Sequence, residues 1–283
     1  MDFTQLRKFL PKTKTDGVSL IIFLFLGHCA AYFEIFVILP FVYRDGWDYT
    51  YYIHLTFIGI LYFNCMGNMY RLIMTETGSA GLMLPIVLKE GWKFCAVCEC
   101  NAPPRAYHCS LCNKCILKRD HHCQFTGNCV GFANLRFYMH MLGYMWIATL
   151  YANIMNFDYA YITLDGFSAK SLILMVLPLI AWLCNFSETY TITSAFMTSM
   201  CLVTFLLVSA LLIYHMRNIV GGQTVKENTY DIKTFDLGWK KNIMIAFGRN
   251  WKYCWLCPFI SSPLIGDGTQ FSNKELFEAS KDV

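Results

Sequence analysis

Long uncharged apolar stretches constrain the fold of this 283-residue chain more than any other feature. A helix needs about 20 apolar residues to cross the roughly 30 Å hydrocarbon core of a bilayer, whereas a soluble core is built from shorter amphipathic periods. Charged residues make up only 15% of the chain, against 56% hydrophobic residues. We therefore expect an integral membrane protein. The apolar stretches are 18–42, 50–74, 137–157, 171–186 and 192–216.

The lysines and arginines between these stretches predict the orientation of the chain. The N-terminal segment 1–17, the insert between the second and third stretches and the tail 217–283 are basic, whereas the loops 43–49 and 158–170 hold mostly aspartate. Because basic residues of short loops concentrate on the cytosolic side, both termini and the insert are expected in the cytosol.

The fourth stretch, 171–186, decides the number of spans. An even number of crossings must separate the cytosolic insert from the cytosolic tail, yet three apolar stretches lie between them. This stretch is short, contains Pro178 and is followed by Glu188. We expect it to be a lumenal re-entrant or interfacial segment, or an early part of the last crossing. The expected fold is all-α with four transmembrane helices, and a fifth crossing is the alternative.

The insert, a cysteine-rich segment over 93–136, holds eight of the fourteen cysteines of the chain, interleaved with histidines. Repeated Cys-x-x-Cys spacings of this kind are typical of zinc sites in a reducing compartment. Two tetrahedral zinc ions would leave three of the candidate ligands unused. The candidates are Cys95, Cys98, Cys100, His108, Cys109, Cys112, Cys115, His121, His122, Cys123 and Cys129.

This surplus of ligands indicates catalysis, because a purely structural zinc module has no need for a free thiol beside a free imidazole and a carboxylate. Asp120, His121 and Cys123 supply these three groups. A neighbouring imidazole lowers the pKa of a thiol, and a base that is oriented by a third group completes an activated nucleophile. By residue type, Cys123 fits the nucleophile, His121 the general base and Asp120 the group that orients His121.

The run Asp120-His121-His122-Cys123, with closely spaced cysteines before it and Gly-Asn-Cys-Val-Gly over 127–131 after it, resembles the DHHC family of protein S-acyltransferases. The resemblance implies that Cys123 carries an S-palmitoyl intermediate and that two structural zinc ions hold the domain. The implied ligand sets are Cys95, Cys98, His108 and Cys115 for one zinc ion, and Cys109, Cys112, His122 and Cys129 for the other.

The resemblance continues in the tail. The segment from Thr224 to Glu227 looks like a degenerate Thr-Thr-x-Glu motif of the family, and Asn242 lies in a segment similar to its C-terminal motif. The segment 258–268 is similar to the mammalian branch of the family numbered 24. These matches imply supporting roles for Thr224, Glu227 and Asn242.

Three residues depart from the family pattern. Gln124 and Phe125 stand where the family usually has Pro-Trp, and Val225 replaces the second threonine, so that its side chain cannot donate a hydrogen bond to Asp120. A catalytically weakened scaffold that binds proteins, or a zinc-module adaptor, is therefore the alternative to an active enzyme.

The resemblance also implies partners and a location. The acyl donor is expected to be a long-chain acyl-CoA such as palmitoyl-CoA, with Lys118 and Arg119 as candidate contacts for its phosphates. Substrates are expected to be membrane-associated proteins with cytosolic juxtamembrane cysteines, and the lipid bilayer is the other partner. The expected membrane is that of the endoplasmic reticulum or the Golgi. Nucleic acid is not expected, because no basic and aromatic residues interleave in a stripe.

Overall fold

The computed structural model describes residues 10–79 and 84–273, so the expectations for 1–9, 80–83 and 274–283 lie outside the described residues. The chain divides into two compact units. Unit 1 consists of the chain up to Phe23, Met66–Met141 and the chain from Leu212 onward; unit 2 consists of Leu24–Cys65 and Leu142–Leu211. The cysteine-rich segment lies wholly in unit 1.

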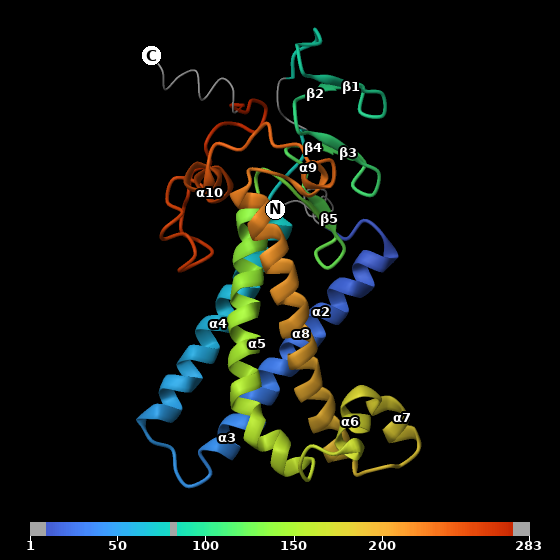
Figure 1. The fold of residues 1–283 in the computed structure, drawn as a ribbon, viewed down its shortest axis with the longest axis vertical. Helices are drawn as coiled ribbons and strands as arrows, with labels where there is room; N and C mark the ends of the chain where they lie inside the picture. Colours follow the sequence, from blue (N-terminus) through green and yellow to red (C-terminus); the bar gives the residue numbers. More distant parts are fainter. Residues whose placement is uncertain (1–9, 80–83, 274–283) are drawn as a thin grey trace. The chain divides into compact units, whose positions relative to one another are not determined.

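Long helices lie over the four expected spans (Figure 1). Two of them are long and apolar enough to cross a membrane, namely Lys14–Val42 and Thr189–Val220, among the described residues. The helices are α2 (Lys14–Phe33), which continues through the π-helical turn η2 (Glu34–Ile38) into α3 (Leu39–Val42), then α4 (Tyr49–Met74), α5 (Leu135–Thr163) and α8 (Thr189–Val220).

Polar pairs lie inside unit 2 beside its apolar core. The core packs Phe33 and Ile38 against Tyr159. Asn156 donates a hydrogen bond of 2.9 Å to the buried carboxyl of Glu34. Such groups are costly in a bilayer unless they find partners inside the helix bundle.

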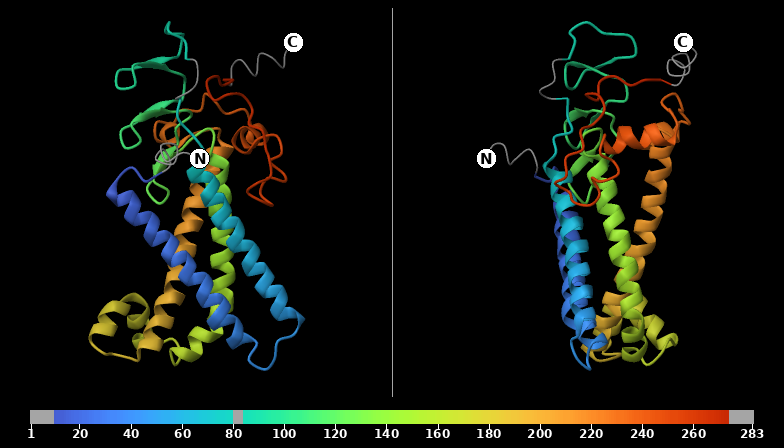
Figure 2. Two further views of the ribbon diagram at one scale, coloured as in Figure 1. Left: turned by 180° about the vertical axis from the view of Figure 1, so that it is seen from behind. Right: turned by 90° about the vertical axis from the view of Figure 1, so that its left-hand side faces the viewer.

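The stretch 171–186 forms two short helices, α6 (Ala169–Val176) and α7 (Pro178–Leu183), which are separated where Pro178 interrupts the helical hydrogen bonding. They span only about 12 Å and about 9 Å, well short of a hydrocarbon core. Within unit 2, Leu174 and Ala181 are buried against the end of α5 and the start of α8 (Figure 2).

The cysteine-rich segment of unit 1 contains six strands of three residues each, so the expectation of an all-α fold was wrong for this part of the chain. Each Cys-x-x-Cys or equivalent turn closes an antiparallel hairpin, because the two ends of such a turn must converge on one ligand position. The hairpins are β1 (Lys93–Cys95) with β2 (Cys100–Ala102), β3 (Tyr107–Cys109) with β4 (Lys114–Ile116), and β5 (His121–Cys123) with β6 (Asn128–Val130).

The tail of unit 1 contains two further helices, α9 (Val225–Thr229) and α10 (Trp239–Phe247). Thr224 caps α9: its hydroxyl accepts from the amide of Glu227, whose carboxylate accepts from the amide of Thr224. Helix α10 begins after Gly238 and ends at Gly248, both of which have positive φ angles that glycine adopts readily.

Candidate active site and metal centres

The middle hairpin, β3–β4, contributes ligands to two separate cysteine and histidine clusters. Successive side chains of a strand point to opposite faces, so the neighbours His108 and Cys109 of β3 are directed to different clusters. In each cluster the ligand atoms lie within 4.8 Å of one another. Cluster 1 is Cys95, Cys98, His108 and Cys115, and cluster 2 is Cys109, Cys112, His122 and Cys129.

The distances in cluster 2 fit a tetrahedral zinc site. Nδ1 of His122 lies 3.8, 3.4 and 3.7 Å from the sulfurs of Cys109, Cys112 and Cys129. A tetrahedral zinc ion with Zn–S of about 2.3 Å and Zn–N of about 2.1 Å sets edges of about 3.6 Å between sulfur and nitrogen. Cluster 1 offers the same donors, with 3.2 Å between the sulfur of Cys98 and Nδ1 of His108. Both clusters are therefore compatible with zinc, as the expected ligand sets require.

Strand β5 separates the two adjacent histidines of the motif. Because residues two apart in a strand share a face, His121 and Cys123 lie on one side of β5 and His122 lies on the other. His122 pairs in register with Cys129, its fellow member of cluster 2. One strand of three residues thus places a member of cluster 2 on one face and the candidate catalytic pair on the other.

His121 and Asp120 form a hydrogen-bonded pair, with 2.8 Å between Nδ1 and Oδ2. Burial lowers the pKa of His121, but Asp120 and Cys123 outweigh it and raise that pKa to about 9. Burial raises the pKa of Cys123, while the hydrogen bond and charge of His121 lower it below its usual value. The charged forms of His121 and Cys123 therefore stabilise each other.

His215 of α8 is a member of this site that the sequence analysis did not single out. Its Nδ1 lies 3.3 Å from Oδ2 of Asp120, and Tyr138 of α5 meets its Nε2 at 3.2 Å. The ring of Tyr138 also packs edge-on against His121, at 4.9 Å between ring centroids. Both residues lie in apolar helices, so no local pattern pointed to them; a polar side chain near the end of a predicted span was the available signal.

The degenerate Thr-Thr-x-Glu motif meets Asp120 through its main chain. The amide of Val225 donates a hydrogen bond of 3.0 Å to Oδ1 of Asp120, at the first turn of α9, where helix amides have no partner within the helix. Asp120 thus accepts a hydrogen bond from this motif that does not depend on the side chain at position 225. The cap formed by Thr224 and Glu227 fixes the position of this amide.

Glu227 also forms a buried ion pair with Arg105 of the cysteine-rich segment. Two guanidinium nitrogens donate to its carboxylate, at 2.8 and 2.6 Å, and both side chains are almost completely buried. The planar guanidinium lies over the ring of Phe235, at 4.3 Å from the centroid. This bidentate contact joins the tail to the loop between β2 and β3.

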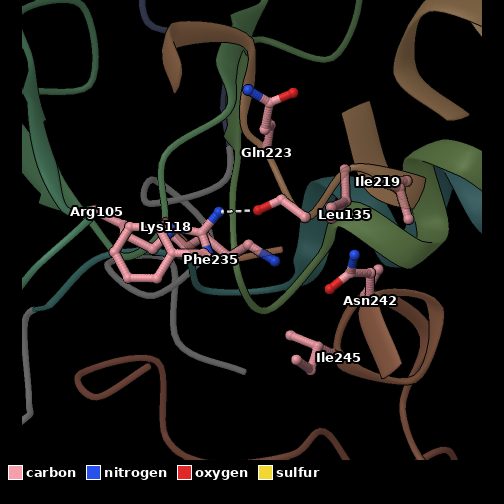
Figure 3. A pocket seen from close by; sticks show the side chains of 10 residues that line it. Arg105, Lys118, Leu135, Ile219, Gln223, Phe235, Asn242 and Ile245 are labelled. Atoms are coloured by element: carbon pink, nitrogen blue, oxygen red, sulfur yellow. Dashed lines mark hydrogen bonds between the residues drawn. The ribbon is translucent and has the colours of Figure 1, made fainter. Parts of the chain in front are cut away.

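Lys118 and Asn242 line a small pocket beside this ion pair (Figure 3). Its cavity volume of about 10 Å³ holds about one water molecule. Burial, with the nearby charge of Arg105, lowers the pKa of Lys118 to about 7. Arg119 lies beside the sulfurs of cluster 2. The expectation that Lys118 and Arg119 contact acyl-CoA phosphates stays a prediction.

Asn242 ties α10 to the end of α8. Its amide nitrogen donates to the carbonyl oxygen of Val220 and to Asp236, each at 2.7 Å, and its amide oxygen accepts from Leu237 at 3.1 Å. These hydrogen bonds are made within the tail and with the last residue of α8. Asn242 therefore holds α10 and the loop before it against the end of α8.

The segment around Asp16 covers the face of the β5–β6 hairpin on which His122 lies. Oδ1 of Asp16 lies 3.4 Å from Nε2 of His122, the nitrogen that faces away from cluster 2. A carboxylate in this position orients a metal-binding histidine. Pro11 packs so closely on the turn after Cys123 that a Cβ on Gly127 would lie 2.7 Å from its Cα. The sequence analysis missed Asp16, because it lies more than 100 residues from its partner.

The residues that depart from the family pattern after Cys123 are exposed in this turn. Gln124 and Phe125 both lie at the surface, and the ring of Phe125 is 6.0 Å from that of Phe23 in α2. They occupy neither cluster 2 nor the Asp120–His121 pair.

Two asparagines attach the β5–β6 hairpin and the residues after it to the end of α4. Asn128 donates to the carbonyl oxygen of Ile73, and Asn134 donates to that of Leu72, each at 3.2 Å. The other contacts of Asn134, to Gly131 and Cys129, close the chain between β6 and α5. Cys123 is therefore held close to the point where α4 ends.

Comparisons with known proteins agree with this site. Residues 88–232 match the model of the DHHC palmitoyltransferase family. The chain is 38% identical over 222 residues to "Probable palmitoyltransferase ZDHHC24" of Danio rerio, covering 78% of this chain and 75% of that protein. It is 33% identical over 210 residues to the Homo sapiens protein of that name, covering 74% of each, and 31% identical over 211 residues to "Palmitoyltransferase ZDHHC15" of Rattus norvegicus, covering 71% of this chain and 57% of that one. The chain belongs to the DHHC palmitoyltransferase family.

Proposed function

We propose that this membrane protein is a protein S-palmitoyltransferase that moves a long-chain acyl group from acyl-CoA to protein cysteines through a thioester on Cys123. The observation that carries the proposal is the placement of His121 and Cys123 together on one face of β5, with Asp120 bonded to the imidazole. A nucleophile, a base and an orienting carboxylate are the parts that covalent acyl transfer needs.

In the first half of the reaction, the thiolate of Cys123 attacks the carbonyl carbon of the acyl-CoA thioester. The bond from that carbon to the CoA sulfur breaks, and the CoA thiolate takes the proton of the His121 imidazolium. Asp120, which accepts from His121, His215 and the amide of Val225, keeps the imidazole in one orientation during this transfer.

In the second half, His121 removes the proton of a substrate cysteine, and the resulting thiolate attacks the acyl group on Cys123. The thiolate of Cys123 leaves and its pair with protonated His121 is restored. One thioester is exchanged for another in each half, so no oxidant or energy source is needed.

The two clusters are proposed to bind structural zinc. Each supplies four protein donors, which fill a tetrahedral site and leave no position for a reactive water. Their zinc would fix the hairpins that present His121 and Cys123.

The proposed topology has four spans, formed by α2–α3, α4, α5 and α8, with both termini and the cysteine-rich segment in the cytosol. The basic residues of these parts support the orientation. The short α6 and α7 would stay on the lumenal side. Asn128 and Asn134, bonded to the end of α4, would hold Cys123 at the cytosolic membrane surface, within reach of juxtamembrane cysteines.

The donor is proposed to be palmitoyl-CoA, with its acyl chain among the helices and its phosphates near Lys118 and Arg119. The substrates would be membrane-associated proteins of the endoplasmic reticulum or the Golgi.

Turnover in liposomes tests the proposal against the scaffold alternative. The purified chain, palmitoyl-CoA and a lipid-anchored peptide with one cysteine are mixed, and the acylated peptide is measured by mass spectrometry. We expect many acylated peptides per enzyme molecule and none with Cys123→Ala. A wild-type chain that binds the peptide without acylating it would support the scaffold instead.

A further inference from the structure

We propose that the loop over 249–260, which follows α10, is a membrane anchor that inserts aromatic side chains into an anionic cytosolic leaflet. The inference rests on the four-span arrangement proposed above. It concerns a surface of unit 1 that takes no part in the acyl-transfer site.

The loop exposes large apolar side chains in place of burying them. Tyr253, Trp255, Leu256 and Phe259 are each at least half exposed, although they lie within seven consecutive residues. Contiguous apolar surface of this kind marks an interaction site on a folded protein. The indole N–H of Trp255 donates to the carbonyl oxygen of Lys252 at 2.6 Å, so its polar group is already satisfied when the ring leaves water.

Two buried contacts hold the loop at a defined position along the axes of α4 and α5. Pro258 packs on Gly67 of α4, where a Cβ would lie 2.6 Å from its ring. The sulfur of Cys254 lies 3.8 Å from Nε2 of His140 in α5. Gly67 and His140 lie about 10 Å and about 8 Å inside the ends of their helices, at 1.5 Å per residue.

These depths are close to the boundary between the membrane interface and the hydrocarbon core. The polar region on each side of the hydrocarbon core is about 5–8 Å thick. If α4 and α5 span, the loop lies beside them at the level of the lipid head groups. It is on the side of the membrane where α4 ends and α5 begins (Figure 1). Tryptophan and tyrosine, whose aromatic rings carry a polar group, are enriched at the membrane–water interface.

The charge of the loop favours an anionic leaflet over a protein partner. Arg249 and Lys252 are exposed and precede the exposed aromatic side chains, and no acidic residue occurs between 249 and 260. Each basic residue near an anionic surface changes the ratio of docked to undocked loop by about five-fold. Aromatic and basic residues together are typical of segments that lie in the membrane interface.

Lipid cross-linking tests the proposal on the full chain in nanodiscs. Phosphatidylcholine that carries a photoreactive diazirine near its head group is activated by light, and labelled peptides are mapped by mass spectrometry. The peptide that contains Phe94 and Val97 of the first hairpin is the control, because these side chains are equally exposed and apolar. We expect several-fold more lipid on the 249–260 peptide than on the control peptide.

Two variants sharpen the test. Gly67→Leu displaces Pro258 without altering the exposed rings, and should reduce labelling of the loop to the level of the control peptide. The pair Arg249→Gln and Lys252→Gln should lose the increase in labelling that phosphatidylserine causes in the wild type. Zinc content, thermal stability and acyl transfer are measured on the same samples.

Equal labelling of the loop and the control peptide in the wild type, with acyl transfer intact, would overturn the inference and leave the proposed function standing. Cross-links between Trp255 peptides of two chains would also overturn it, because a second copy would then cover the loop. A labelled loop in a chain without transferase activity would instead contradict the proposed function alone.

Discussion

The two cysteine and histidine clusters have the same four donors but lie against different parts of unit 1. Cluster 1 packs beside an apolar group that includes Leu117 and Phe132 and reaches the tail at Leu264 and Phe271. Cluster 2 shares β5 with His121 and Cys123. The same set of donors thus lies against the tail in one place and behind His121 and Cys123 in the other.

The largest effect is expected from the loss of a ligand of cluster 2. Zinc contributes on the order of 10 kcal/mol to the folding of small zinc domains, as much as the whole stability of many proteins. Cys109→Ala should therefore abolish self-acylation and lower the yield of folded protein and its zinc content. Cys95→Ala, in the more exposed cluster 1, should keep the zinc of cluster 2 and measurable self-acylation.

Zinc content by elemental analysis and self-acylation by gel fluorescence distinguish these two variants. Full zinc content and unchanged thermal stability in Cys109→Ala would rule out its place in cluster 2. An equal loss of zinc content and self-acylation in both variants would show that the two clusters contribute equally to folding and to acyl transfer.

Replacing the two adjacent histidines separates chemistry from metal binding. His121→Ala should lower the rate of acyl transfer by about 10²–10⁴-fold, the usual contribution of a general base, with zinc content unchanged. His122→Ala should lose zinc and folded protein. The measurements are single-turnover rates and zinc content; loss of zinc in His121→Ala would contradict the back-to-back placement on β5.

A smaller effect is expected from the carboxylate behind cluster 2. Asp16→Asn should weaken zinc binding by about 10–100-fold, since a carboxylate behind a metal-binding histidine contributes roughly this much. Release of zinc to a coloured chelator measures the change. Thr13→Ala is the matched control, because Asp16 also caps α2 together with Thr13. If both variants release zinc at the same rate, capping and not the contact with His122 explains the effect.

The smallest effect is expected where the chain departs from the family motif. Val225→Thr should change the transfer rate by less than about five-fold, the factor that one ordinary hydrogen bond supplies. The main-chain amide of Val225 already donates to Asp120, so a hydroxyl adds little. A hundred-fold gain in the measured rate would show that this donor is inadequate.

Local sequence patterns predicted those features that depend only on residues close together in the chain. The Cys-x-x-Cys spacings indicated zinc, the resemblance supplied both ligand sets, and the long apolar runs indicated helices over 18–42 and 192–216. The hairpins were missed because strands of three residues have no periodicity of their own.

Long-range contacts decided the rest of the site. His215 and Tyr138 join Asp120 and His121 only because α5 and α8 come together beside β5. The ion pair of Arg105 with Glu227 links residues more than 100 positions apart. No spacing in the sequence encodes such contacts, so the sequence pointed to Asp120, His121 and Cys123 but not to His215, Tyr138 or Arg105, which contact these residues or the motif beside them.

The most direct test of the account is to locate the acyl group on the enzyme itself. Purified chain is incubated with an alkyne-bearing palmitoyl-CoA, and the labelled residue is identified by mass spectrometry before and after treatment with hydroxylamine. We expect one hydroxylamine-sensitive thioester on Cys123, absent in Cys123→Ala. Equal labelling of Cys123→Ala, or a label confined to other cysteines, would contradict it.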